Sequence, residues 1–340
     1  MIRVGLVGYG LAGQVFHAPL IRACDRMELA TVLTSRKAPV RVGTLDELIE
    51  VSDLVVVASP NQTHFPIAKA ALEAGRHVVV DKPFTVTLDE ADELIALAER
   101  KGRVLSVFHN RRWDSDFLTV RSVMPRLGEV MLYEAHWDRF RPQIKQGWRE
   151  QPDAGGGVLS DLGPHLIDQA LQLFGMPEAV SADIVTQRAG AVVDDYFDLT
   201  LHYGRRRVRL CCSTLIGAPR PRFAIHGTQG SYIKHGVDPQ EAQLKAGLDH
   251  GDESFGVDSR DGAFVGPAGE AESVPTNKGN YPAFYEAVAD SILNGAPPPV
   301  PANEARDGLA LINLARRAAT LGSVLPVPDA SSREASAPAE

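Results

Sequence analysis

The segment Gly8-Tyr9-Gly10-Leu11-Ala12-Gly13 has the residue types and the spacing that bind a dinucleotide. It has the form GxGxxG, and it lies between the apolar residues 2–7 and a helix-forming stretch. In that context the first glycine permits a tight turn, the second lets a pyrophosphate approach the backbone, and the third lets the helix pack close. The phosphates would also meet the positive end of the helix. Three glycines alone are a weak signal, but their place between strand and helix predicts a dinucleotide site.

The end of the second predicted strand indicates which dinucleotide binds. A site for NAD has Asp or Glu there, about 20 residues after the glycines, to bind the ribose hydroxyls. This chain has Ser35 and Arg36 instead, followed by Lys37, and the segment LATVLTSRK contains no acid. A guanidinium can hold a 2′-phosphate through two hydrogen bonds and stack on adenine, so we predict NADP rather than NAD. The alternative is that Arg36 and Lys37 are solvated loop residues.

Two longer motifs complete a set that resembles a known family. The first is SPNQTH at residues 59–64, followed by GRHVVVDKP at residues 75–83; the second is GGVLSDLGPHLID at residues 156–168. With the glycine loop they resemble the Gfo/Idh/MocA family of pyridine-nucleotide oxidoreductases across essentially the whole chain. The segments YGLAGQVFHAPLI, HNRRWDSDFLTVR, GWRE and DLGPHLIDQALQLFG are most similar to its NADP-dependent scyllo-inositol dehydrogenase group. The family's usual EKP is here Asp81-Lys82-Pro83, a shorter acid of the same charge.

The resemblance implies roles for individual residues. Lys82 corresponds to the catalytic lysine, His165 to the proton-transferring histidine, and Asp161 to the carboxylate that binds the substrate or orients that histidine. Outside the glycine loop, Ser35 and Arg36, the implied cofactor contacts are Ser59, Pro60, Asn61, His64, Asp81, Lys82 and Asn110. The implied substrate contacts are Lys82, Arg111, Trp148, Asp161 and His165.

The implied reaction is hydride transfer between NADP and a secondary alcohol of a polyol or sugar such as scyllo-inositol. It needs a base for the hydroxyl proton, and a neutral imidazole near pH 7 suits that task. Lys82 follows the fourth predicted strand, at the sheet edge where open α/β proteins bind ligands, and its ammonium would stabilise an alkoxide. A metal held by Asp161, His165 and Asp168 is disfavoured, because a neighbouring lysine repels a divalent cation, and we expect none.

Other functions fit the same motifs. A different sugar dehydrogenase, a reductase or a dihydrodiol dehydrogenase of the family would keep this machinery, because fold and cofactor do not fix the substrate. A regulator that binds NADP and a sugar without turnover is a further alternative. The presence of both Lys82 and His165 favours the enzyme.

The elements that must position these residues begin with a Rossmann domain. Up to residue 107, short β-rich runs at 2–7, 29–33, 53–59, 77–81 and 104–108 alternate with helical stretches, which predicts a doubly wound parallel sheet. Thr87, Glu90 and Gly102 predict a capped helix, and residues 63–74 predict another. Pro19 predicts a kink or a restart near residues 16–18. We expect Pro164 in the first turn of its helix, which would leave Asp161 before the helix.

After residue 118 strands follow one another through hairpins, which predicts an α+β domain with a large, mainly antiparallel sheet. We therefore assign 1–118 to the NADP-binding domain, 119–328 to a substrate and oligomerisation domain, and 329–340 to a disordered tail. Residues 236–280 read as loops, and helices at 283–293 and 304–321 close the fold. Along this sheet Asp198, Thr200 and His202 form a polar face, through which we expect a homo-oligomer, a dimer or a tetramer.

Composition and charge narrow the partners. The 340 residues exceed what one hydrophobic core usually supports, so two domains are expected. A formal net charge of −8 disfavours nucleic acid and acidic membranes, which reward a concentrated basic surface. The three cysteines are too few for a disulfide framework, and no leader pattern or long apolar span is present, so we expect a cytoplasmic protein.

Overall fold

The computed structural model describes residues 1–145, 147, 150–152 and 155–328. The chain forms two compact units, and each draws on separated stretches of sequence. The first consists of Met1–Arg126, Lys234–Phe264 and Glu270–Leu309, and the second of Leu127–Ile233, Val265–Gly269 and the chain from Ala310. The predicted domain boundary after residue 118 stays a prediction, and the predicted tail, 329–340, lies outside the described residues.

The first unit contains the predicted Rossmann sheet. Its described strands are, in spatial order, β3 (Arg41–Val42), β2 (Met27–Leu33), β1 (Ile2–Val7), β4 (Leu54–Val57), β5 (His77–Asp81) and β6 (Leu105–Phe108). Every neighbouring pair is parallel, which confirms the predicted fold class. All four residues of β4 are buried, as expected for a central strand covered on both faces. Because the strands are parallel, the residues that follow β1, β4 and β5 meet at one edge.

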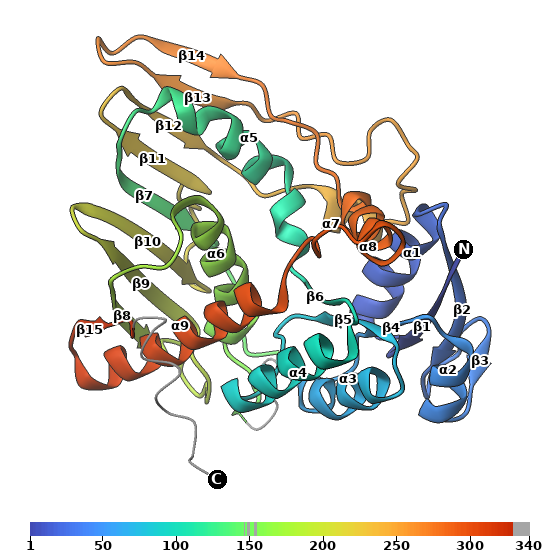
Figure 1. The fold of residues 1–340 in the computed structure, drawn as a ribbon. Coiled ribbons are helices and arrows are strands. Elements are labelled where there is room, and N and C mark those ends of the chain that lie inside the picture. Colours follow the sequence, from blue (N-terminus) through green and yellow to red (C-terminus); the bar gives the residue numbers. More distant parts are fainter. Residues whose placement is uncertain (146, 148–149, 153–154, 329–340) are drawn as a thin grey trace. The chain divides into compact units, whose positions relative to one another are not determined.

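The first unit also contains α-helices. They are α1 (Ala18–Ala23), α2 (Leu45–Val51), α3 (His64–Glu73), α4 (Leu88–Lys101), α5 (Ser115–Val123), α7 (Gln240–Lys245) and α8 (Pro282–Asn294). Figure 1 shows α3 and α4 side by side, and the two helices pack on each other. The predicted caps of α4 are confirmed: Thr87 and Glu90 form a reciprocal capping box, and Gly102 ends the helix with φ 60°.

The helix after the glycine loop restarts where Pro19 predicts. Residues Ala12–His17 form a π-helix, and α1 begins at Ala18 with Pro19 in its first turn. Proline has no amide hydrogen and its ring clashes with the carbonyl four residues earlier, so a proline at this point disfavours a continuous regular α-helix. The wider π-helical turns before it accommodate the change, as is common beside functional sites.

The second sheet is mostly antiparallel, as predicted. Nine strands of the described chain form it, in the order β14 (Ala271–Val274), β13 (Gly262–Val265), β12 (Gly230–Lys234), β11 (Phe223–Gly227), β7 (Val130–His136), β10 (Arg206–Ser213), β9 (Tyr196–Tyr203), β8 (Ala179–Val185) and β15 (Leu325–Pro326). The pair β7 and β10 is parallel, whereas β8, β9, β10 and the pair β11 and β7 run antiparallel. The long helix α6 (Val158–Phe174) packs on β10 and β9 (Figure 1).

Two expectations from the sequence are wrong in this region. Pro164 lies inside α6, in its second turn, because the helix already begins at Val158. The stretch 236–280 contains α7, β13 and the whole of β14 as well as loops, although few of its residues are apolar. The two closing helices are confirmed as α8 and α9 (Ala302–Leu321).

Candidate active site

The glycine loop after β1 has the geometry of a dinucleotide cradle. Gly8 has φ +96°, and a Cβ there would lie 2.4 Å from the Ala58 carbonyl oxygen. A Cβ on Gly13 would lie 2.1 Å from the Gly8 carbonyl oxygen, so the third glycine is required for helix-to-strand packing. By contrast, a Cβ on Gly10 would meet nothing within 4 Å. The loop therefore leaves open space at the one glycine where a pyrophosphate must approach the backbone.

The loop after β2 presents Ser35 and Arg36 to solvent. Both residues are exposed, and the Arg36 amide donates to the Thr34 hydroxyl oxygen at 3.1 Å, which shapes the turn. The first acid after Glu28 is Asp46, so no carboxylate follows this strand. The Arg36 guanidinium lies where an NAD site has an acid, and its positive charge suits an anionic group of a ligand.

The loop after β4 offers polar atoms at the same edge of the sheet. The Thr63 hydroxyl donates to the Pro60 carbonyl at 2.7 Å and therefore accepts the Ser59 hydroxyl, 2.6 Å away. The side-chain oxygen of Asn61 is buried and has no hydrogen-bond partner among the described residues. A buried acceptor without a partner costs free energy, so it indicates a place for a ligand donor. Together with the open Gly10, it fits a dinucleotide in this loop.

His64 joins the loops that follow β4 and β5. Its ring nitrogens lie 2.9 Å from the Pro83 carbonyl oxygen and 3.0 Å from the Ser59 carbonyl oxygen. The residue is 2% exposed. The predicted cofactor residue thus has a structural task, because it holds two loops of the site at a fixed spacing.

Asp81 and Lys82 follow directly at the end of β5. One Asp81 oxygen accepts the Lys82 amide at 2.8 Å, and the other lies 3.8 Å from His17 Nε2. Burial opposes ionisation of Asp81, but the contact with His17 and the charges of Lys82 and His64 leave its pKa below the ordinary value. Asp81 is therefore a carboxylate, and Lys82 is half-buried beside it.

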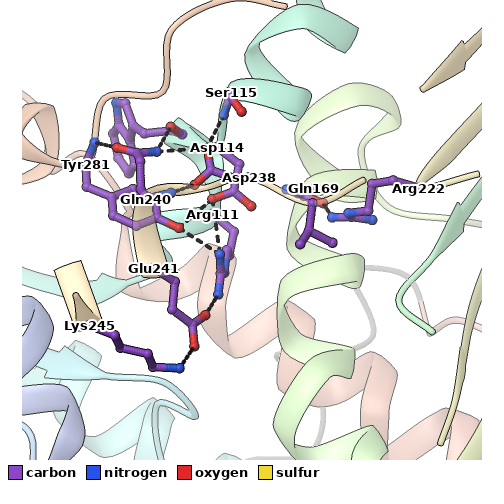
Figure 2. Close-up of polar contacts among 12 residues, drawn as sticks. Arg111, Asp114, Ser115, Gln169, Arg222, Asp238, Gln240, Glu241, Lys245 and Tyr281 are labelled. Atoms are coloured by element: carbon purple, nitrogen blue, oxygen red, sulfur yellow. Dashed lines mark hydrogen bonds and ion pairs between the residues drawn. The ribbon is translucent and has the colours of Figure 1, made fainter. Parts of the chain in front are cut away.

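Arg111 is predicted to bind substrate, and the structure gives its guanidinium several protein partners. It donates to the Tyr281 hydroxyl at 2.7 Å and to Glu241, while Tyr281 donates to Asp114 at 2.7 Å (Figure 2). Arg111 is 6% exposed. Its substrate role stays a prediction. The network joins α7 and the residue that precedes α8 to the segment that follows β6.

The charges of this network stabilise one another. Burial opposes ionisation of Glu241, but the charges of Arg111 and Lys245 lower its pKa to about 2. Burial likewise opposes the charge on Arg111, and Tyr281, Asp114 and Glu241 nevertheless raise its pKa. Neighbouring Asn110, a predicted cofactor residue, is 6% exposed at the start of the short helix Asn110–Trp113.

In the second unit, α6 carries Asp161 and His165. The helix starts at Val158 because Asp194 caps it from a distant loop: its carbonyl accepts the Val158 amide at 2.9 Å, and its carboxylate accepts the Leu159 amide at 2.7 Å. Gly157 has φ +103° and no space for a Cβ beside Asp194. Burial raises the pKa of Asp194 although that amide bond opposes the shift.

Asp161 and His165 lie one turn apart on the face of α6 that packs on the sheet. Asp161 is 8% and His165 is 5% exposed. Arg139 places a guanidinium nitrogen 3.9 Å from an Asp161 oxygen, and the Trp137 ring lies 6.1 Å from the His165 ring. The predicted pair is thus held together in a polar but largely buried setting.

Behind this pair is a buried arginine. Arg222 is 2% exposed and donates to the Gln169 side chain at 2.8 Å (Figure 2). Its guanidinium lies over the rings of Trp137 and Phe223 at 4.7 Å and 4.2 Å. This stack fixes the Trp137 ring that packs beside His165.

A hollow of about 200 Å³ opens beside Asp161, within the second unit. Its lining includes Arg139, Gly157, Asp161, Arg188, Asp194 and Thr214. The Thr214 hydroxyl is buried and has no hydrogen-bond partner in the described part of the chain. The sequence did not identify Arg139, Asp194 or Thr214, because they come from other strands and loops and match no motif.

The remaining predictions are untested. Trp148, a predicted substrate contact, lies outside the described residues. The structure brings the cofactor residues together in the first unit, and Asp161 and His165 in the second. The absence of a metal stays a prediction. No helix of the described chain has the length and apolar character needed to cross a membrane.

Comparison with known proteins identifies the family. Residues 2–109 match the profile described as an oxidoreductase family's NAD-binding Rossmann fold, and residues 125–328 match its C-terminal alpha/beta domain. The chain belongs to the Gfo/Idh/MocA family of oxidoreductases. This confirms the resemblance predicted from the motifs.

Several Gfo/Idh/MocA relatives are similar over nearly their full length. The Escherichia coli oxidoreductase YdgJ is 49% identical over 92% of this chain and 95% of its own. The scyllo-inositol 2-dehydrogenase (NADP(+)) IolW of Bacillus subtilis is 39% identical over 92% of both chains. A solved oxidoreductase structure from Yersinia pestis, YPO2259, is 47% identical with a TM-score of 0.93 over 96% of this chain and 97% of that one.

Proposed function

We propose that the protein transfers hydride between NADP and a secondary alcohol of a polyol or sugar. The observation that carries this proposal is the glycine loop, which is open at Gly10 and closed at Gly8 and Gly13, with Asp81 and Lys82 at the same sheet edge. Family membership and the similarity to IolW, which is named for scyllo-inositol and NADP, support it. When bound, NADP supplies the hydride acceptor for oxidation and the donor for reduction.

The residues proposed to hold the cofactor lie in the first unit. The glycine loop offers backbone amides to the pyrophosphate, Arg36 a guanidinium to the 2′-phosphate, and Asn61 a buried acceptor. Ser59, Pro60, His64 and Asn110 belong to the same proposal. The absence of an acid after β2 favours NADP over NAD.

The proposed chemistry divides between Lys82 and His165. In alcohol oxidation, the imidazole of His165 accepts the hydroxyl proton while the electron pair of the C–H bond leaves as hydride. The ammonium of Lys82 stabilises the negative charge that develops on the oxygen. Asp161, Arg139 and the unpartnered hydroxyl of Thr214 offer acceptors and donors to the other hydroxyls of a polyol, in the hollow beside α6.

Turnover on a panel of polyols tests the assignment. Absorbance of NADPH is followed with inositols, sugars and dihydrodiols, for the parent, Lys82→Ala and His165→Ala. We expect both variants to lose about 100-fold to 10,000-fold in kcat/KM, the usual range for an acid–base group. Lys69→Ala is the control, because it removes a surface ammonium paired with Glu93 at 2.7 Å. Full turnover in both variants would overturn the roles, and binding without turnover in the parent would favour a sensor.

Cofactor choice has its own test. Removing a charge-assisted hydrogen bond costs about 1.5–3 kcal/mol, so Arg36→Ala should raise KM for NADP by roughly 10-fold to 100-fold and leave KM for NAD unchanged. The control is Arg22→Ala, which removes an exposed arginine from α1. An equal effect of Arg36→Ala on both cofactors would contradict the assignment.

We propose that the protein works as a homo-oligomer in the cytoplasm. Along the second sheet, Arg209 donates to Glu134 at 3.1 Å and to Asp198 at 2.7 Å, which makes a polar face suited to a second copy. All three cysteines are free and buried, as in a reducing compartment. Sedimentation equilibrium of the parent and of Arg209→Glu tests the first point, and a monomeric parent would refute it.

A further inference from the structure

One buried histidine of the first unit has no place in the chemistry proposed above. His17 is fully buried, at the last position of the π-helix Ala12–His17. Its Nδ1 lies 2.6 Å from the Tyr285 hydroxyl, and its ring packs on Phe108 with the centroids 4.3 Å apart. The Tyr285 bond and the Phe108 contact fix the plane of the imidazole, so its Nε2 points in a defined direction.

That direction is toward Asp81. His17 Nε2 lies 3.8 Å from one Asp81 oxygen, while the other oxygen accepts the Lys82 amide at 2.8 Å. The distance is longer than a hydrogen bond, and His17 Nε2 has no hydrogen-bond partner among the described residues, so its contact with the carboxylate is electrostatic. The Asp81 side chain is 17% exposed, so the interaction is weakly screened by solvent. The carboxylate is therefore held between a fixed imidazole and the backbone of Lys82.

The charges around Asp81 agree with this arrangement. The groups that act on it are His17, Lys82 and His64, and together they overcome burial and lower its pKa. Tyr285 faces the same pair from α8, and burial with the Asp81 charge raises its pKa, so the hydroxyl keeps its proton. A carboxylate and a neutral phenol thus hold the imidazole from opposite sides.

We propose that His17 is a positioning residue for Lys82 and acts through Asp81. This inference rests on the proposed function, in which Lys82 is the catalytic lysine. Pro19 stops the regular helix, the π-helical turn brings His17 inward, His17 holds Asp81, and Asp81 fixes the peptide from which the Lys82 side chain departs. Without His17, the Lys82 amide alone restrains the carboxylate, and the peptide that carries the Lys82 side chain is held less firmly.

The two ring nitrogens can be tested separately. Asparagine reaches the position of Nδ1 and glutamine that of Nε2, so His17→Asn keeps a partner for Tyr285, and His17→Gln keeps one for Asp81. Tyr285→Phe removes the bond that orients the ring. The matched control is His77→Gln at the opposite end of β5, where the ring accepts the Val104 amide at 3.0 Å.

We expect His17→Asn to lower kcat by about 10-fold to 100-fold, as small misplacements of reacting groups do, with KM for the polyol changed less than threefold. His17→Gln should recover most of that loss, and Tyr285→Phe should fall between the two. His77→Gln should lower Tm about as much as His17→Asn does and should keep the parent kcat. Unchanged kcat in His17→Asn, or no recovery in His17→Gln, would overturn the inference.

A second measurement does not depend on turnover. Lysines are reductively methylated with 13C-formaldehyde, and the Lys82 signal is assigned by its loss in Lys82→Arg. We expect this signal to shift in His17→Asn and to stay in place in His77→Gln; no shift in His17→Asn overturns the inference. If no polyol is turned over by the parent, the proposed function fails, and this signal still decides whether His17 positions Lys82. Should His17→Asn not fold, His17→Gln and Tyr285→Phe supply the same comparison.

Discussion

Two alanine substitutions in the glycine loop should affect different properties. Gly10→Ala should weaken NADP binding and keep the stability, whereas Gly13→Ala should lower the stability. At Gly10 a Cβ meets nothing within 4 Å, and the backbone there is outside the left-handed region, so alanine fits the folded protein. Gly→Ala at a compatible site adds about 0.4–1 kcal/mol of stability by restricting the unfolded chain. At Gly13 a Cβ would lie 2.1 Å from the Gly8 carbonyl oxygen, and this neighbour is backbone that cannot rotate away.

The magnitudes follow from these contacts. Overpacking costs about 1–3 kcal/mol, and at roughly 2–4 °C per kcal/mol Gly13→Ala should lower Tm by several degrees. Gly10→Ala should keep or slightly raise Tm. It places a methyl group where the pyrophosphate approaches, so its Kd for NADP should rise by at least about tenfold, which corresponds to about 1.4 kcal/mol.

Calorimetric titration with NADP and a thermal melt of each variant check this pair. The control is Gly102→Ala in the αL cap of α4, which should lower Tm without changing Kd. If Gly10→Ala binds NADP as tightly as the parent, the open space at Gly10 is not the pyrophosphate position. The dinucleotide interpretation of the loop would then be refuted.

Three further predictions concern buried charges and are read by urea unfolding. The pKa of Glu241 is lowered from 4.5 to about 2, so its stabilisation is present above pH 4.5 and is lost as the pH falls toward 2. The parent and Glu241→Gln should differ in free energy of unfolding by at most roughly 3 kcal/mol, from 1.36 kcal/mol per pKa unit, and this difference should disappear over that pH range. Parallel curves of unfolding free energy against pH would contradict the prediction. Asp194→Ala should cost about 1 kcal/mol through loss of the α6 cap and raise hydrogen exchange at 158–163; unchanged exchange there would contradict it. Lys234→Met should cost about 3 kcal/mol because Asp258 loses its buried partner at 2.9 Å, whereas Arg3→Ala at an exposed pair should cost less than about 1 kcal/mol; equal costs would contradict it.

The features that the sequence predicted correctly depend on interactions between residues close together in the chain. The glycine spacing, the box of Thr87 and Glu90 and the turn at Gly102 are fixed by neighbours within four residues, and the structure has each of them. The parallel strands were found from their apolar runs. The short strand β3 was missed. A helix between the second and third strands was expected, and α2 lies there, but its capping box of Thr44 and Glu47 was not identified.

What the sequence could not predict depends on partners far along the chain. Arg139 and Thr214 reach the hollow from a loop after β7 and from the end of β10, more than 70 residues apart. Arg222 reaches Gln169 across 53 residues, and Arg111 reaches Glu241 across 130. No local pattern marks these residues, because their burial and pairing are decided by the packing of α6 and α7.

Pro19 and Pro164 show where the local rule for proline in helices is not sufficient by itself. Before Pro19 the helix has π-helical turns and restarts as α1, and His17 is buried at the end of those turns. At Pro164 the same rule predicts a helix start, yet Asp194 accepts the amides of the first turn and moves the start back to Val158. Asp161 is consequently inside the helix, one turn before His165, rather than in the loop before it. The proposed substrate carboxylate and the proposed base therefore share one face of α6 only because a loop about 35 residues away caps the helix.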